Sequence, residues 1–156
     1  MDAAACAAIY APFVTDTAVT FEYDPPDADE FARRIDSAHV WLVAEVGGDV
    51  VGYAYSGPWG TRAAFAWSCE VSVYLGPEAR GQGLGKALYT ELLDRSRTLG
   101  MHVAVSGIAL PNDASVALHE SFGFDLVGVY REVGYKFGAW HDLARYQLRL
   151  NTGVPQ

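Results

Sequence analysis

The chain has 156 residues, 51% of them hydrophobic, which suits one compact domain (residues 1–156) with a sizeable buried core. Its formal net charge of −8 argues against a general binder of nucleic acids or anionic membranes, because both surfaces would repel it. No run approaches the roughly 20 apolar residues of a membrane span, and the first residues lack the basic segment of a signal peptide. We therefore expect a cytoplasmic protein.

The first half of the chain predicts two helices followed by three strands. Helices are expected at 3–14 and 27–38, and strands at 41–46, 50–57 and 65–75. The first two strands are separated by Gly47 and Gly48, which are typical of a hairpin turn because glycine accepts a positive φ. The third strand is almost continuously apolar, as expected of a central strand covered on both faces.

The second half alternates helices and strands. Leu84, Leu88, Leu92 and Leu99 recur at near-helical spacing before Gly100, which predicts a helix. Strands are expected at 102–110, 125–133 and 143–150, with a helix at 112–122. This order predicts an α/β (α+β) fold, in which a mixed central sheet carries helices on both faces.

The cysteines and histidines do not form a metal-binding pattern. Cys6 and Cys69 are far apart in the sequence, and we expect reduced, packed thiols rather than a disulfide. His102, His141 and Asp142 lack the spacing of a metal site, so no metal is expected.

A glycine-rich loop between the third strand and the following helix is the most informative motif. Unpaired N–H groups at a helix start bind anions, and glycines allow a phosphate to approach them closely. Gly81 and Gly85 enclose three residues, and Ala87 follows Lys86, so the spacing is not that of a P-loop. The G-x-G-x-G pattern also differs from the G-x-G-x-x-G of dinucleotide-binding folds. The loop therefore predicts a different pyrophosphate ligand.

The run Arg80 to Gly85, R-x-x-G-x-G, resembles the coenzyme A pyrophosphate loop of the GNAT acetyltransferases. Residues 13–26, 69–88, 112–124 and 132–142 resemble the phosphinothricin and methionine-sulfone acetyltransferase branch of that superfamily. The resemblance implies the GNAT fold. Members ordinarily begin with a strand before the first helix, whereas this chain starts almost at the helix, so either the start is misplaced or the first edge strand is absent. An absent strand would reduce stability or expose a sheet edge.

The resemblance implies acetyl-CoA as co-substrate and assigns its contacts. The expected cofactor-binding residues are Val73, Tyr74, Leu75, Arg80, Gly81, Gln82, Gly83, Leu84, Gly85, Lys86, Asn112 and Ser121. The three strand residues would present backbone groups to the pantetheine arm, and the loop would hold the pyrophosphate. Asn112 could instead serve only as a helix N-cap.

Two residues are candidates for the chemistry. Glu70 lies in an apolar strand, where burial would favour its neutral form and suit it to act as a base, the role that the resemblance also implies. The alternative is a structural carboxylate paired with an arginine. His119 stands where most GNAT members have a tyrosine, and it is either an acid, an organiser of the substrate site, or a packing residue.

The acceptor is expected to be an amino-acid-like amine. Arg62, with Phe65 beside it, and Lys136 are the candidates for binding its carboxylate, and Phe21 and Tyr23 resemble the aromatic wall of the family's substrate pocket. The two aromatic residues could instead only cover the protein surface.

The resemblance implies an N-acetyltransferase that acts on the α-amine of methionine sulfone, methionine sulfoximine or phosphinothricin by direct attack in a ternary complex. A covalent Cys69 intermediate is disfavoured, because neighbouring strand residues point to opposite faces and Glu70 follows it. The resemblance also implies a homodimer. The alternatives are acetylation of another amine, such as a polyamine, an aminoglycoside or a protein N-terminus, and a CoA-binding protein without turnover.

Overall fold

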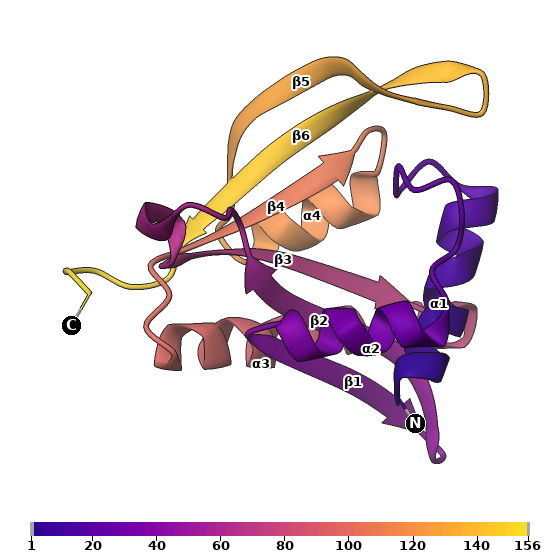
Figure 1. Cartoon of the computed structure of the whole chain (residues 1–156), viewed down its shortest axis with the longest axis horizontal. Helices are drawn as coiled ribbons and strands as arrows, with labels where there is room; N and C mark the ends of the chain where they lie inside the picture. The colour runs from indigo at the N-terminus through magenta and orange to yellow at the C-terminus, as the bar shows by residue number, and fades with distance from the viewer. Residues whose placement is uncertain (1, 156) are drawn as a thin grey trace.

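The computed structural model describes residues 2–155, and it is built on a six-stranded mixed sheet (Figure 1). Met1 and Gln156 lie outside the described residues. The helices are α1 (Asp2–Asp16), α2 (Ala28–Ser37), α3 (Leu84–Thr98) and α4 (Asp113–Ser121), with 3-10 turns η1 (Ala63–Phe65) and η2 (Pro77–Ala79). The strands are β1 (Val40–Val46), β2 (Asp49–Pro58), β3 (Ser68–Leu75), β4 (Val103–Ala109), β5 (Asp125–Lys136) and β6 (Ala139–Arg149).

The strand order is β1-β2-β3-β4-β6-β5, in which β3 and β4 are parallel and the other neighbours are antiparallel. The mixed sheet confirms the fold class predicted from the sequence. Within residues 2–155 no strand precedes α1, and β1 forms one edge of the sheet. None of the helices described there is both long and apolar enough to cross a bilayer.

A side-chain cap begins one helix, and two glycines form the first hairpin turn. The side chain of Asp27 accepts a hydrogen bond from the backbone N–H of Glu30 at 2.8 Å, which caps α2. Gly47 and Gly48 join β1 to β2 with φ values of 60° and 88°, a conformation that glycine adopts without strain.

Helices α1 and α2 cover one face of the sheet through an aromatic cluster. Tyr10, Phe31 and Tyr53 are nearly inaccessible to solvent and pack with Cys6 and Val14. Trp41 stacks on Tyr53 with ring centroids 5.1 Å apart. This packing holds the two helices over β1, β2 and β3 and leaves the same face of β4, β6 and β5 without a helix.

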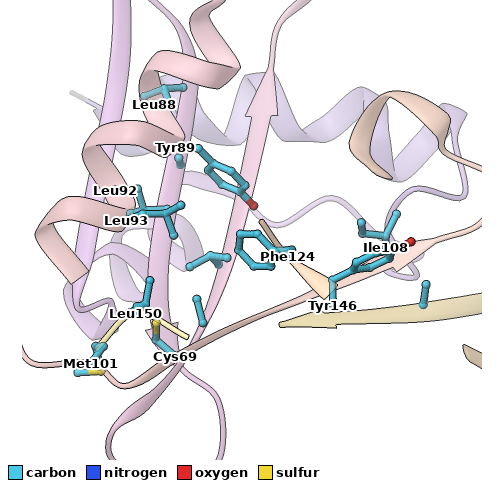
Figure 2. Packing of buried hydrophobic residues seen from close by; sticks show 14 residues of the cluster. Cys69, Leu88, Tyr89, Leu92, Leu93, Met101, Ile108, Phe124, Tyr146 and Leu150 are labelled. Atoms are coloured by element: carbon cyan, nitrogen blue, oxygen red, sulfur yellow. The ribbon is translucent and has the colours of Figure 1, made fainter. Parts of the chain in front are cut away.

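Helix α3 covers the opposite face and supplies the main core (Figure 2). Leu92 and Leu93 are almost completely buried there beside Cys69 and Val71 of β3. Burial of each such leucine stabilises the fold by about 1.5–3 kcal/mol. Because Cys69 and Val71 face α3, alternation directs Glu70 to the other face of the sheet.

Strands β5 and β6 form a longer hairpin than the sequence predicts. The expected strands ended at 133 and began at 143, whereas the pairing continues to the turn at Phe137 and Gly138. Register shifts near Gly128 and Gly134 bend the hairpin. The glycines between aromatic residues concealed these strand ends in the sequence, because glycine disfavours a strand prediction.

The hairpin holds the connection between α1 and α2 by three contacts. The ring of Phe21 packs on Gly134, and a Cβ built on this glycine would lie 2.6 Å from the ring. The Tyr23 hydroxyl donates to the carbonyl of Tyr135, and Lys136 Nζ donates to the carbonyl of Thr20 at 2.9 Å. The connection is thereby held beside the open face of β4 and β6.

We expect Gly134→Ala to destabilise the fold by about 1–3 kcal/mol, because the added methyl group overlaps the Phe21 ring and must displace it. Gly128→Ala is the matched control on the same strand, since nothing lies within 4 Å of its Cβ position. Urea unfolding of both variants measures the difference. Equal stability of the two variants would show that Phe21 moves away without cost.

Candidate active site

A cavity opens where the two parallel strands β3 and β4 separate. The β3–β4 pairing extends only from Ser68–Val103 to Glu70–Val105, although β3 continues to Leu75 and β4 to Ala109. A cavity of about 590 Å³ opens beyond that point, lined by the ends of both strands together with residues of α1, α3 and α4. Ser72 to Leu75 remain paired with β2 on their other side. Their edge toward β4 is therefore free to pair with a ligand.

The glycine loop stands beside this cavity at the start of α3. Gly81 and Gly83 have φ values of 76° and 75°, which confirms the need for glycine at both turns. Gly85 is buried where α3 packs on β3, and a Cβ there would make an ordinary contact of 3.4 Å with the Leu75 side chain. The Gln82 side chain donates to the carbonyl of Glu78 at 2.6 Å and braces the loop.

The loop can bind an anion at the cavity mouth. The first backbone N–H groups of α3, which begins at Leu84, have no partner within the helix. Arg80 lines the cavity, with its guanidinium 5.5 Å from the centre of the Phe13 ring. Lys86 is exposed in the first turn of α3. Open amides, Arg80 in the cavity lining and an exposed Lys86 in the next helix turn fit a diphosphate that carries an organic arm.

Helix α4 forms the opposite wall. Asn112 Oδ1 accepts a hydrogen bond from the backbone N–H of Ser115 at 3.2 Å, so Asn112 caps the helix, and it also lines the cavity. The capping role is therefore observed, and contact of Asn112 with the cofactor stays a prediction. Ser121, in contrast, lies outside the cavity lining, and its hydroxyl donates to the carbonyl of Leu118 at 2.6 Å.

His119 is buried in this wall and is tied at both ring nitrogens. Nδ1 lies 2.7 Å from the carbonyl of Ser115, which can only accept, so Nδ1 carries the proton. Nε2 therefore accepts a hydrogen bond from the Tyr89 hydroxyl at 2.8 Å. Burial lowers the pKa of His119 and keeps it neutral, although the bond to Ser115 works in the other direction.

The hydrogen bond between Tyr89 and His119 fixes the orientation of both side chains in the cavity wall. Burial raises the pKa of Tyr89 well above its usual range, and a hydrogen bond with Ser106 partly offsets this rise. With His119 neutral, the Tyr89 proton points at Nε2 and not into the cavity. His119 is therefore a buried, hydrogen-bonded residue of the cavity wall, and whether it acts as an acid or organises the substrate site stays a prediction. Tyr89 could direct a proton to a ligand only after His119 is protonated.

The lowered pKa of His119 predicts a loss of stability in mild acid. Below about pH 6.5 the histidine binds a proton in the unfolded chain but not in the folded one. The unfolding free energy therefore decreases as the pH decreases, by at most about 1.4 kcal/mol per pH unit. Urea unfolding between pH 7.5 and 5.5 measures this slope. His119→Gln should flatten the slope and His102→Gln should not, whereas equal slopes in all three proteins would contradict the prediction.

Glu70 is not buried as the sequence analysis expected. Its side chain is 40% exposed on the open face of the sheet, because α1 and α2 do not extend over β4 and β6. Its Oε1 lies 3.7 Å from Nη1 of Arg145 on β6. The arginine neighbour of the structural alternative is therefore present, and the role of Glu70 as a base stays a prediction.

The expected substrate residues do not gather in one place. Arg62 and Phe65 lie on the exposed segment before β3, where Phe65 packs edge-on against Trp59 with ring centroids 4.7 Å apart. Lys136 is buried with its ammonium bonded to Thr20. Phe21 contacts Gly134, and Tyr23 is largely exposed. None of these lines the cavity.

Sequence reasoning missed Tyr89 and Arg145. Tyr89 follows Leu88 in an amphipathic helix, where it cannot be told from a packing residue without knowing that α4 brings His119 to it. Arg145 is one of two arginines in the last predicted strand, and nothing in the local sequence distinguishes it from a surface residue. Its only signal was alternation, which directs it to the face opposite Ala144 and Tyr146.

The cysteines show no catalytic arrangement. Both are unpaired and fully buried, and burial raises the pKa of each thiol to about 11, which opposes formation of a thiolate. Cys69 faces α3, away from Glu70. Among residues 2–155, no three His, Cys, Asp or Glu side chains cluster in a way that could hold a metal ion.

Comparison with known proteins agrees with this geometry. The model of the acetyltransferase (GNAT) family matches residues 7–124. A phosphinothricin N-acetyltransferase from Streptomyces viridochromogenes is 40% identical over 99% of this chain and 86% of its own. An L-methionine sulfoximine/L-methionine sulfone acetyltransferase from Salmonella typhimurium is 39% identical, over 96% and 90% respectively. An acetyltransferase from Salmonella typhimurium, solved with its cofactor acetyl-CoA, superposes with a TM-score of 0.93 at 37% identity, covering 99% of this chain and 91% of that one.

Proposed function

The chain belongs to the GNAT family of acetyltransferases, and we propose that it transfers an acetyl group from acetyl-CoA to the α-amine of a small amino-acid-like acceptor. The parting of β3 and β4 beside the glycine loop is the observation that carries this proposal. The acceptor class is that of the named relatives, methionine sulfone, methionine sulfoximine and phosphinothricin.

The cavity fits acetyl-CoA, which supplies an acetyl group activated as a thioester. The open edge of Val73, Tyr74 and Leu75 would pair with the amide-bearing arm in the manner of an added strand. The loop amides, Arg80 and Lys86 would hold the pyrophosphate. Asn112 would contact the arm from α4 while capping the helix, and Ser121 would contact the ligand outside the cavity.

Glu70 would act as the base of the reaction. An amine attacks only when neutral, so the carboxylate accepts the proton of the substrate ammonium directly or through water. The amine nitrogen then replaces sulfur at the acetyl carbon, and the sulfur leaves as a thiolate that takes up one proton. The exposed carboxylate faces the side of the sheet left open by α1 and α2, which supports entry of the acceptor from there.

Several residues would shape the acceptor site around Glu70. Phe21, held on Gly134, would form an apolar wall, and Arg62 with Phe65 would approach from the segment before β3. Lys136 would support this wall through Thr20. His119 would keep α4 in register through Tyr89.

Thiol release from acetyl-CoA tests the proposal. The native chain should release thiol with methionine sulfone, methionine sulfoximine or phosphinothricin, and mass spectrometry should find one acetyl group on the α-nitrogen. Spermidine, kanamycin and a ribosomal N-terminal peptide serve as the competing acceptors. Turnover with one of these alone would replace the acceptor class, and acetyl-CoA binding without any turnover would leave a CoA-binding protein.

The proposed oligomer is a homodimer in which the β5–β6 hairpin lies in the interface between the two chains. Leu126, Val127, Tyr130, Phe137 and Trp140 are each more than half exposed on it. Such a concentration of exposed apolar side chains on an edge hairpin is typical of an interface. We also propose a cytoplasmic location for the protein. Its two unpaired thiols are consistent with a reducing compartment.

Light scattering after gel filtration is expected to give twice the 16.9 kDa of the chain. Val127→Glu should shift the protein toward the monomer, because a charge would be buried without a partner. Val154→Glu, which alters an exposed residue near the C-terminus, is the control. A native monomer at micromolar concentration would refute the dimer.

A further inference from the structure

An arginine stands beside the proposed base on the open face of the sheet. The 3.7 Å between Arg145 Nη1 and Glu70 Oε1 exceeds hydrogen-bond length, and 30% of the Arg145 side chain remains exposed. The two groups attract each other, yet neither fills the hydrogen-bonding capacity of the other. A ligand with one positive and one negative group could therefore bind between the two side chains.

A glycine on the neighbouring strand β4 makes room for this arginine. Gly107 of β4 is directly opposite Arg145, and a Cβ there would lie 3.0 Å from Nη1. On the other side, Gly128 of β5 is paired with Arg145 and has nothing within 4 Å of its Cβ position. Gly107 also lines the cavity. The guanidinium therefore crosses β4 at the margin of the cavity and points toward Glu70.

The other cations proposed for substrate binding are less well placed. Lys136 is buried, with its ammonium already donating to Thr20. Arg62 lies on the exposed η1 segment, before the start of β3. Arg145 is the cation that lies within 4 Å of Glu70 among the described residues.

We infer that Arg145 binds the carboxylate of the acceptor while Glu70 binds its ammonium group, an inference that rests on the proposed function. In an α-amino acid the two charged groups are attached to one carbon atom, which matches a base and a guanidinium a few ångströms apart. The guanidinium can donate two parallel hydrogen bonds to a carboxylate. This arrangement selects α-amino acids over simple amines and directs the amine at Glu70.

Equilibrium binding tests the inference without requiring turnover. Methionine sulfone and its α-carboxamide are titrated by calorimetry into the native chain saturated with CoA, which has no acetyl group to transfer. The native chain should bind the acid at least about tenfold more tightly than the carboxamide, because the carboxamide loses the charged hydrogen bonds. In Arg145→Gln the two affinities should differ less than about threefold.

Two further variants and a second assay sharpen the result. Arg145→Lys should keep part of the preference for the acid, and Arg149→Gln, an exposed residue on the same strand, should keep all of it. Equal weakening of both ligands in Arg145→Gln would mean that Arg145 only positions Glu70 and would overturn the inference. Loss of the preference in Arg62→Gln instead, or a native chain without preference, would do the same.

Thiol release in the same samples separates this inference from the proposed function. A native chain that prefers the acid through Arg145 but releases no thiol from acetyl-CoA supports the inference and removes the activity. Turnover without any preference for the acid supports the activity and overturns the inference. Unchanged thermal unfolding of each variant in the presence of CoA establishes that the fold is intact.

Discussion

Glu70→Gln is expected to lower kcat with methionine sulfone about a hundredfold at pH 7, the usual contribution of a positioned base. Glutamine keeps the shape of the side chain and cannot accept the ammonium proton. The deficit should shrink as pH rises, because more of the free amine is then neutral in solution. Thiol release across a pH series measures both effects.

Three further measurements show that the loss comes from the base. Acetyl-CoA affinity of Glu70→Gln should match that of the native chain, since Glu70 does not line the cavity. Its stability should change by no more than about 1 kcal/mol, because the pair with Arg145 is partly exposed. Glu45→Gln, on the exposed edge strand, should leave kcat unchanged. A Glu70→Gln enzyme of native rate at pH 7 would exclude Glu70 as the base.

Gly83→Ala is expected to weaken acetyl-CoA binding about tenfold. Gly83 precedes α3 with φ of 75°, and an alanine there is strained by about 1–2 kcal/mol. The loop relieves this strain by leaving the conformation in which its amides face a phosphate. Acetyl-CoA binding must then return the loop to that strained conformation, which weakens the affinity. Calorimetric titration with acetyl-CoA measures the change.

Gly48→Ala is the matched control for this loop variant. Gly48 has φ of 88° in the β1–β2 turn, and, like Gly83, it has nothing within 4 Å of its Cβ position. Both variants should lose similar stability, but Gly48→Ala should bind acetyl-CoA as the native chain does. Unchanged affinity in Gly83→Ala would mean that the pyrophosphate does not depend on the loop conformation.

The cofactor half of the site was predictable because it is continuous in the sequence. A strand, a glycine loop and a helix occupy adjacent residues, so their order alone predicts amides that face an anion. Positive φ at Gly81 and Gly83 explains why glycine stands at these two positions of the loop.

The acceptor half was less predictable because its parts come from distant segments. Glu70 was expected to be buried, since its strand is apolar, but the layer of α1 and α2 ends before β4 and leaves its carboxylate exposed. Arg145 reaches Glu70 only because β6 inserts next to β4 and Gly107 leaves a gap. Lys136 and Thr20 are likewise 116 residues apart before folding joins them.

The sequence by itself determined the element order, the mixed sheet, the turns that require glycine and the anion-binding loop, because each depends on residues that are near neighbours along the chain. Only the tertiary structure decided which charged groups face each other, how far Glu70 is exposed and which hydrogen bonds hold His119. Those properties depend on strand order and on the extent of the covering helices, and the local pattern of a segment does not specify either of them.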